Sequence, residues 1–394
     1  MGNVPHLRFP EFTEEWKETK LGKIAEITKG SGISKDRLSE YGSPCILYGE
    51  LYTKYKSEII NEVYSRTELD SSLLVKSKAN DVIIPCSGET AIDISTARCV
   101  PFNNILLGGD LNIIRLKNND GGFFAYQLNG TRKKDIARVA QGVSVVHLYG
   151  ENLKHIRVYH PAIEEQKKIT RLLSLIDKRI ATQNKIIEKL QSLIKGLSQQ
   201  LLSSENDWIL YRLDDLAQIK SGYSGTQVSY QTPYKVSRIE TISKHCIDIQ
   251  RIGYVECIPE SYRLNVGNIL FSNINSIQYI GNTAYLDKDY GLYHGMNLLR
   301  IIPNTTIVRP RFLHLLLCTD WAINHFQTIC NKAVSQASIN QTALGKSRFP
   351  IPPMSVQQQI CSMFELTERK LDNEQEYISC LQQQKRYLLQ KMFI

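Results

Sequence analysis

The sequence predicts an α+β protein in which two α/β globular domains, related by a pseudo-twofold axis, are separated by two long antiparallel coiled-coil helices. Three observations lead to this fold class: a long heptad pattern in the middle of the chain, a second one at its end, and a similarity between the segments that precede them. The predicted boundaries are 1–160 for the first globular domain, 161–203 for the central helix, 204–350 for the second globular domain and 351–394 for the terminal helix.

The helices are predicted from apolar residues that recur at spacings of four and three, which are the a and d positions of a coiled coil. A shift of 191 residues carries the first pattern onto the second and takes the polar mid-pattern residue Gln183 to Glu374. We call these positions the helix-pair seam. Its residues are Ile169, Leu173, Ile176, Ile180, Gln183, Ile187 and Leu190 in the central helix, and Ile360, Phe364, Leu371, Glu374, Ile378 and Leu381 in the terminal helix.

A single heptad pattern of this length is equally typical of a homodimer. Two patterns in one chain can instead pair with each other. Antiparallel pairing would place Gln183 near Glu374, so that each polar seam residue has a partner and neither is buried alone. Internal pairing is therefore the favoured prediction, with one globular domain expected at each end of the paired helices.

The globular segments repeat at their ends and differ in their interiors. Trp16 and Gly30 reappear as Trp208 and Gly222, both 192 residues later. Between such matches lie short apolar runs rich in Ile, Val, Leu and Tyr, broken by Gly, Asn, Asp and Ser. Runs of this length with these breakers are typical of strands and turns. Each half is therefore predicted to be one globular domain followed by one long helix.

The composition favours a polyanionic partner and an intracellular location. The 394 residues carry a formal net charge of +9, which favours binding to an acidic macromolecule. The nine cysteines form no CxxC pair, so neither a zinc ribbon nor a disulfide framework is predicted. With no long apolar stretch and no secretory leader pattern, we expect a cytoplasmic protein that does not contact membranes.

Motifs of common enzymes are missing from the sequence. It contains no G-x-S-x-G, H-E-x-x-H, Walker A or G-x-G-x-x-G pattern, and these carry much of hydrolase, metalloprotease and nucleotide chemistry. The eight histidines are scattered singly. We therefore predict no catalytic residues, no cofactor-binding residues and no metal ligands in this chain.

Three loops that recur in both halves carry the candidate DNA-contacting residues. Gly-Ser loops beside Lys let backbone N–H groups approach phosphates, and Ser, Thr, Asn, Gln and Glu can bond to base edges. Each loop alone is also typical of an ordinary turn, and a basic run such as 132–134 is usually a solvated face. The candidates are Lys29, Ser31, Lys35, Arg37, Ser87, Glu89, Thr90, Lys133, Lys134, Ser144, Lys220, Ser221, Tyr223, Ser224, Arg238, Asn273, Asn275, Gln278, Lys332, Ser335 and Gln336.

The order and doubling of these elements resemble a known family. Two unlike globular domains alternate with two similar helices, each entered through a Pro and a Gln-x-x-Ile, and HLRFPEF (6–12) precedes Trp16. The chain thus resembles the specificity subunit of type I restriction–modification systems. The resemblance implies that the globular domains are target-recognition domains, each reading one half of a bipartite asymmetric DNA site, and that the helices set the spacer between the halves.

The resemblance also implies partners and cofactors. Double-stranded DNA, two modification (methyltransferase) subunits and restriction (translocase and nuclease) subunits are the expected partners. S-adenosylmethionine is expected on the modification subunits and ATP with Mg²⁺ on the restriction subunits, with none in this non-catalytic chain. The second helix departs from the first where Glu165 corresponds to Val356 and Asp177 to Glu368. The alternative is a coiled-coil adaptor whose globular ends bind proteins and not DNA.

Overall fold

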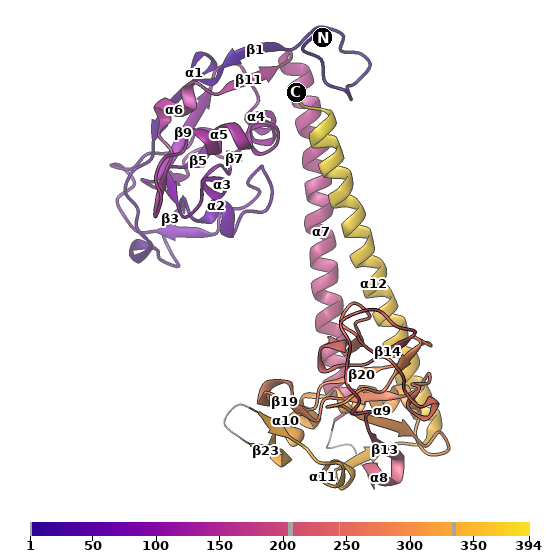
Figure 1. Cartoon of the computed structure of the whole chain (residues 1–394). Helices are drawn as coiled ribbons and strands as arrows, with labels where there is room; N and C mark the ends of the chain where they lie inside the picture. Colours follow the sequence, from indigo (N-terminus) through magenta and orange to yellow (C-terminus); the bar gives the residue numbers. More distant parts are fainter. Residues whose placement is uncertain (1, 204–207, 244, 333–335) are drawn as a thin grey trace. The chain divides into compact units, whose positions relative to one another are not determined.

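The computed structural model describes residues 2–203, 208–243, 245–332 and 336–394. They form two compact units, each of which includes part of both long helices. Unit 1 comprises Met1–Lys185 with Gln375–Ile394, and unit 2 comprises Ile186–Glu374. The long helices are α7 (Ile163–Leu201) and α12 (Met354–Lys391), drawn in pink and yellow in Figure 1. Each helix is two or three residues shorter at either end than the segment assigned to it from the sequence.

Unit 1 contains a four-stranded antiparallel sheet in the order β2-β9-β5-β7, a three-stranded mixed sheet in the order β4-β3-β8, and the strand pairs β1-β11 and β6-β10. Its elements besides the long helices are β1 Lys17–Lys20, α1 Leu21–Ile24, β2 Ala25–Lys29, β3 Ser43–Ile46, α2 Glu50–Thr53, β4 Ser65–Thr67, β5 Asp81–Pro85, β6 Ser87–Gly88, α3 Ala91–Ile94, β7 Arg98–Val100, β8 Leu106–Leu107, β9 Leu111–Leu116, α4 Gly121–Asn129, α5 Lys133–Val139, β10 Val146–His147, α6 Gly150–Lys154 and β11 Arg157–His160.

The four-stranded sheet of unit 1 is buried on both faces. All five residues of β5 are buried, which suits its continuous apolar sequence. Because successive strand residues point to opposite faces, Val82 joins the apolar cluster that contains Trp16 and Phe123, whereas Ile83 joins a separate cluster on the other side. Helix α4 packs in the first cluster, and its N-terminus is capped by Asp120, whose carboxylate accepts the backbone N–H of Phe123 at 2.8 Å.

Unit 2 repeats this plan with sheets in the orders β13-β22-β18-β20, β17-β14-β21, β12-β25, β19-β24-β23 and β15-β16. Its elements are β12 Ile209–Arg212, α8 Leu213–Leu216, β13 Ala217–Ser221, β14 Tyr234–Val236, β15 Ile242–Ser243, β16 Cys246–Ile247, β17 Gly253–Val255, β18 Ile269–Phe271, β19 Ile274–Asn275, β20 Thr283–Tyr285, β21 Leu292–Tyr293, β22 Leu299–Pro303, α9 Pro310–Leu317, α10 Asp320–Ile329, β23 Asn331–Lys332, β24 Ala337–Ser338, α11 Gln341–Gly345 and β25 Arg348–Ile351.

A buried glutamine fixes the start of each long helix to its own unit. In unit 1 the Gln166 side chain accepts the backbone N–H of Asp120 at 2.9 Å and donates to the carbonyl of Pro161 at 2.9 Å. In unit 2 Gln357 accepts the backbone N–H of Arg309 at 2.7 Å and donates to a proline carbonyl at 2.9 Å. The Pro and Gln-x-x-Ile pattern is therefore a repeated junction between domain and helix.

The two long helices are antiparallel within each unit. In unit 1, Ile169 near the start of α7 shares a core with Leu388 near the end of α12. In unit 2, Ile360 near the start of α12 shares a core with Leu197 near the end of α7. The first part of each helix thus meets the last part of the other, as the predicted fold class requires. Among the described residues, no helix is both long and apolar enough to cross a bilayer.

The seam residues lie on the less exposed side of both helices. The predicted proximity of Gln183 to Glu374 concerns residues of different units and stays a prediction. Buried seam residues are Ile169, Leu173, Ile176, Gln183, Ile360, Phe364 and Leu381, and half-buried ones are Ile180, Ile187, Leu190, Leu371, Glu374 and Ile378.

Candidate nucleic-acid interface

In unit 1, three chain segments meet at one end of the four-stranded sheet. Lys29, the last residue of β2, pairs with Asn112 in β9, and the neighbouring Leu111 pairs with Pro85, the last residue of β5. The Asn112 amide donates to the carbonyl of Leu148 at 2.9 Å, so the segment after β10 reaches the same end. We call residues 29–31, 87–90 and 141–147 the loop end of unit 1.

The pairing of β6 with β10 brings two of these segments together. Ser87 pairs with His147, and the loop before β10 is closed by hydrogen bonds of 2.9 and 2.7 Å between the backbones of Gln141 and His147. Glu89 and Ser144 are exposed on the two segments. Side chains that are distant in sequence are therefore close enough to act on one ligand.

Unit 2 builds the same end from different side chains. Ser221, the last residue of β13, pairs with Leu299, which also pairs with Phe271, the last residue of β18. The backbone N–H of Ile339 donates to the carbonyl of Asn273 at 2.8 Å. This bond repeats the 2.7 Å bond from the Leu148 N–H to the Cys86 carbonyl in unit 1.

The sheet β19-β24-β23 joins the two remaining segments of this end. Asn275 and Lys332 both pair with Ala337, which lies between them in β24. Lys332 and Gln336 are exposed, whereas Ser335 lies outside the described residues. We call residues 220–222, 273–278, 332 and 336–338 the loop end of unit 2.

Two of the predicted base-reading amides in unit 2 are engaged within their own loop. The Asn275 amide donates to the Ser272 hydroxyl at 3.1 Å and accepts the backbone N–H of Ser276 at 2.8 Å. The Asn273 amide donates to a backbone carbonyl at 3.3 Å. These residues hold the loop in shape. For Asn275 to contact a base, its amide would have to exchange these hydrogen bonds for bonds to the base. Gln278, in the 3₁₀ turn Ile277–Tyr279, is exposed.

Some candidates in unit 1 have local structural roles. The Ser31 hydroxyl accepts the backbone N–H of Val75 at 2.8 Å, and the Thr90 hydroxyl caps α3. Lys35 and Arg37 are exposed on the 3₁₀ turn Lys35–Arg37. Both can contact phosphates there without losing a buried interaction.

The other candidates in unit 2 are a lysine, a serine, a tyrosine and an arginine. Lys220 in β13 is exposed and belongs to the loop end, and Ser224 is exposed in the following loop. Tyr223 packs edge-on against Tyr262 with 5.3 Å between ring centroids. Arg238 forms a 3.4 Å ion pair with an exposed glutamate of the next turn, an arrangement that leaves it accessible to a phosphate.

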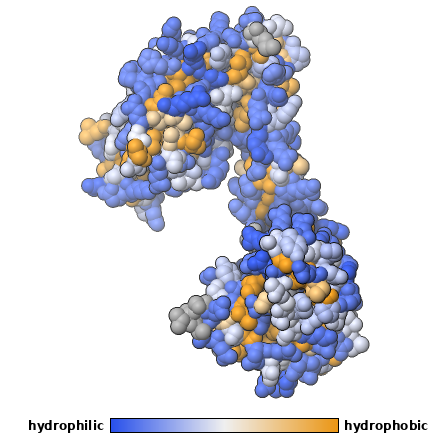
Figure 2. Space-filling view, viewed as in Figure 1, coloured by the Kyte–Doolittle hydropathy of each residue, from blue (hydrophilic) through white to orange (hydrophobic). Residues whose placement is uncertain are grey.

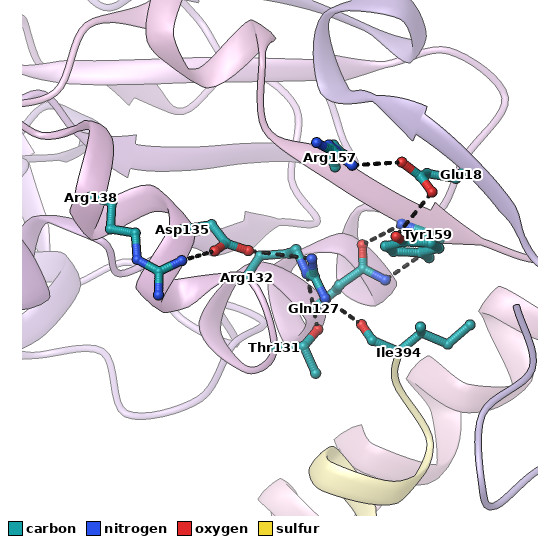
Figure 3. Close-up of polar contacts among 9 residues, drawn as sticks. All are labelled: Glu18, Gln127, Thr131, Arg132, Asp135, Arg138, Arg157, Tyr159 and Ile394. Carbon is teal, nitrogen blue, oxygen red and sulfur yellow. Dashed lines mark hydrogen bonds and ion pairs between the residues drawn. The ribbon is translucent and has the colours of Figure 1, made fainter. Parts of the chain in front are cut away.

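The basic run 132–134 at the start of α5 is only partly a solvated face. Figure 3 shows the Arg132 guanidinium between Asp135 and the main-chain oxygen of Ile394, at 3.3 and 2.7 Å. Lys133 is half-buried, and this burial lowers its pKa. Lys134 is exposed. Arg132 therefore ties unit 1 together, and Lys134 is the residue of the run best placed to meet a phosphate.

A buried ionic cluster on the helix pair of unit 1 was not predicted from the sequence. Lys385 of α12 lies 2.6 Å from Asp177 of α7 and 2.6 Å from Glu58 of the globular domain. The Tyr126 hydroxyl donates to Asp177 at 2.7 Å. Burial and the Glu58 carboxylate raise the pKa of Asp177. Although burial lowers the pKa of Lys385, the two carboxylates raise it by more. The available signal was that Lys385 follows the seam residue Leu381 by four positions and so continues the heptad spacing with a charged residue.

In the described part of the chain, no group of three or more His, Cys, Asp or Glu residues is placed to hold a metal ion.

A family model described as the type I restriction modification DNA specificity domain matches the chain twice, over residues 13–192 and 205–383. The chain belongs to this family. Each copy of the specificity domain ends within a long helix, so the family resemblance and the repeated domain-plus-helix plan are both confirmed.

Two relatives of this chain are named as type I restriction enzyme specificity subunits. It is 38% identical over 193 residues to a putative type I restriction enzyme MjaX specificity subunit from Methanocaldococcus jannaschii, an alignment that covers 48% of this chain and 45% of the relative. The chain thus spans about half the length of that relative. It is 22% identical to the MjaVIII specificity subunit of the same organism, covering 89% of this chain and 85% of that one.

A solved structure shows the same fold over the whole chain. The S subunit of a type I restriction–modification system from M. genitalium superimposes with a TM-score of 0.64 at 16% identity and covers 99% of both chains. At this identity the likeness establishes the shared fold.

Proposed function

We propose that this chain is the DNA sequence-specificity subunit of a type I restriction–modification complex and reads a bipartite asymmetric site, one half-site per unit. The observation that carries the proposal is the duplicated loop end. Both units pair equivalent segments there, but the segment after β5 carries Ser87 and Glu89 in unit 1, whereas the segment after β18 carries Asn275 and Gln278 in unit 2. Such a scaffold suits two readers of different sequences.

The side chains at the two loop ends match different base edges. Glu can accept a hydrogen bond from the cytosine amino group, whereas Gln and Asn can bond to adenine through two atoms. Lys29 and Lys220 are both exposed near the ends of the equivalent strands β2 and β13 and can neutralise phosphates without regard to sequence. Different base contacts in the two units, combined with similar phosphate contacts, account for an asymmetric site.

The modification subunits dock on the outer faces of the long helices. Leu175 and Leu366 are 51% and 58% exposed, and Ile186 and Tyr377 are 36% and 46% exposed. The members of each pair are 191 residues apart and so occupy equivalent helix positions. Because a duplicated surface suits two copies of one partner, these positions support the binding of two modification subunits.

Catalysis belongs to the other subunits of the proposed complex. S-adenosylmethionine bound by the modification subunits supplies the methyl group for adenine. ATP and Mg²⁺ bound by the restriction subunits supply translocation and cleavage. The role of this chain is to position those active sites on DNA.

DNA binding by the chain with its modification subunits is expected to weaken steeply with salt. The slope of log affinity against log salt concentration should be about −0.9 per phosphate neutralised. Lys29→Ala and Lys220→Ala should each weaken binding to all sequences and reduce the slope by about one unit. Fluorescence anisotropy with duplex DNA between about 50 and 200 mM salt measures both quantities.

Lys117→Ala is the matched control, because Lys117 is exposed directly after β9, at the opposite end of that strand from Asn112 and outside both loop ends. It should leave the slope unchanged. Binding that is insensitive to salt in the wild type would favour the protein-binding adaptor instead.

A further inference from the structure

The loop that precedes β10 presents two aliphatic side chains to solvent. Val143 is 96% exposed and Val145 is 53% exposed, on a loop closed by the paired backbone bonds between Gln141 and His147. Gly142 permits this turn, because its φ is +120° and a Cβ there would lie 2.1 Å from the carbonyl oxygen of Val145. The two valines are therefore held in water on a constrained turn.

Hydrogen-bonding side chains surround these valines at the loop end of unit 1. Ser144 lies between them, and the pairing of β6 with β10 brings Ser87 beside the loop. Residues 141–149 include no acidic side chain, while Ile92 and Tyr149 are 51% and 47% exposed. Figure 2 shows hydrophobic residues in small groups within a mainly hydrophilic visible surface. Small apolar contacts among hydrogen-bonding groups suit a DNA groove better than the continuous core of a protein interface.

We propose that this loop recognises thymine in the half-site of unit 1 by packing Val143 and Val145 against the 5-methyl group, an inference that rests on the proposed function. Thymine is the base that presents a methyl group in the major groove. Burial of that one methyl group changes affinity about fourfold. In unit 2, Val334 and Gln336 stand 191 residues after Val143 and Val145. Val334 lies outside the described residues, so the methyl contact is proposed for unit 1 alone.

Deoxyuridine tests this contact, because it pairs as thymidine does and lacks the 5-methyl group. Each thymidine of a duplex that carries the mapped recognition site is replaced in turn. Binding by the complex of this chain with its modification subunits is then measured by anisotropy. At least one replacement within one half-site should weaken wild-type binding about fourfold, and the double variant described next identifies that half-site as the one that unit 1 reads.

The variant that combines Val143→Ala and Val145→Ala should bind the thymidine duplex about as weakly as the wild type binds the deoxyuridine duplex. It should lose no further affinity when deoxyuridine is introduced. Circular dichroism should show an unchanged fold, because both valines are exposed. Val266→Ala is the matched control, since Val266 is a 56% exposed valine of unit 2, and it should keep the wild-type response.

The outcomes separate this contact from the proposed function. A wild-type complex that binds every duplex alike would contradict the proposed function itself. A complex that selects its site but binds thymidine and deoxyuridine equally at every position contradicts only the thymine contact, as does a double variant that keeps the deoxyuridine response. A double variant that loses its modification subunits while keeping its DNA selectivity overturns the proposal in favour of a protein contact.

Discussion

Lys385→Met is expected to destabilise unit 1 by about 3–5 kcal/mol, because it leaves two buried carboxylates without their cation. The side chains of Glu58 and Asp177 are 11% and 7% exposed, and that of Lys385 is 15% exposed. Methionine preserves most of the side-chain length, so the loss reports on charge more than on packing. The cluster joins the globular domain of unit 1 to both helices, and its loss should loosen all three.

Hydrogen exchange resolved by peptide measures this loss, since unit 2 then serves as an internal reference. Peptides of α4 and of residues 163–185 should lose protection, and peptides of unit 2 should not. Lys370→Met is the control, because Lys370 is 60% exposed and pairs with a glutamate one helical turn away. It should cost less than about 1 kcal/mol. Equal effects of the two variants would show that the buried cluster contributes no more than a surface pair.

The two units hold the equivalent helix acid with different cations. Asp177 corresponds to Glu368 after the shift of 191 residues, and Lys385 corresponds to Ile194. In unit 2 the cation comes from α9, where Arg311 donates to Glu368. The acid that differed between the helices in the sequence is thus paired in both units. In unit 1, Glu58→Gln should recover part of the stability that Lys385→Met removes, and it should have no such effect in unit 2.

Removal of one heptad from each long helix is expected to shorten the spacer of the DNA site by up to about three base pairs. Deletion of residues 183–189 and 374–380 removes about 10 Å of helix at about 1.5 Å per residue. The two deletions are equivalent under the shift of 191 residues and preserve the seam on either side. The helix length sets an upper limit, because the helices need not run parallel to the DNA.

The half-sites themselves should not change in the shortened protein, because neither loop end is altered. Mapping of methylated sites gives the spacer and both half-sites in one experiment. Deletion of a heptad from α7 alone is the control, and it should abolish methylation because the two seams no longer match. A shortened protein that keeps the original spacer would contradict the role of the helices as a ruler.

The sequence predicts the repeated frame of the protein well. The match of Trp16 to Trp208 marks the start of the repeated β-α-β element, and the spacing of Ile169 and Leu173 marks the buried side of α7. Patterns of this kind are local and periodic, so burial on one side of a helix is enough to produce them. The fold class follows from them because each pattern occurs twice.

The composition of the loop ends could not be predicted from such patterns. Ser87 meets His147 through a ladder of two residue pairs between short strands, which leaves no periodic signal. Arg132 resembles a solvated basic residue in the sequence, but it binds the main chain of Ile394 across unit 1. Val143 resembles any loop valine until its exposure is known. Long-range pairing, and not local propensity, decides which side chains share a surface.

Methylome mapping tests the central claim most directly. The chain is expressed with its cognate modification subunit in cells that lack other adenine methylation, and methylated positions are read along the genome. We expect one bipartite motif with two unlike half-sites, a fixed unspecified spacer and a methylated adenine in each half. A continuous or palindromic motif, or methylation that does not depend on this chain, would contradict the account of two different DNA readers on a duplicated helix pair.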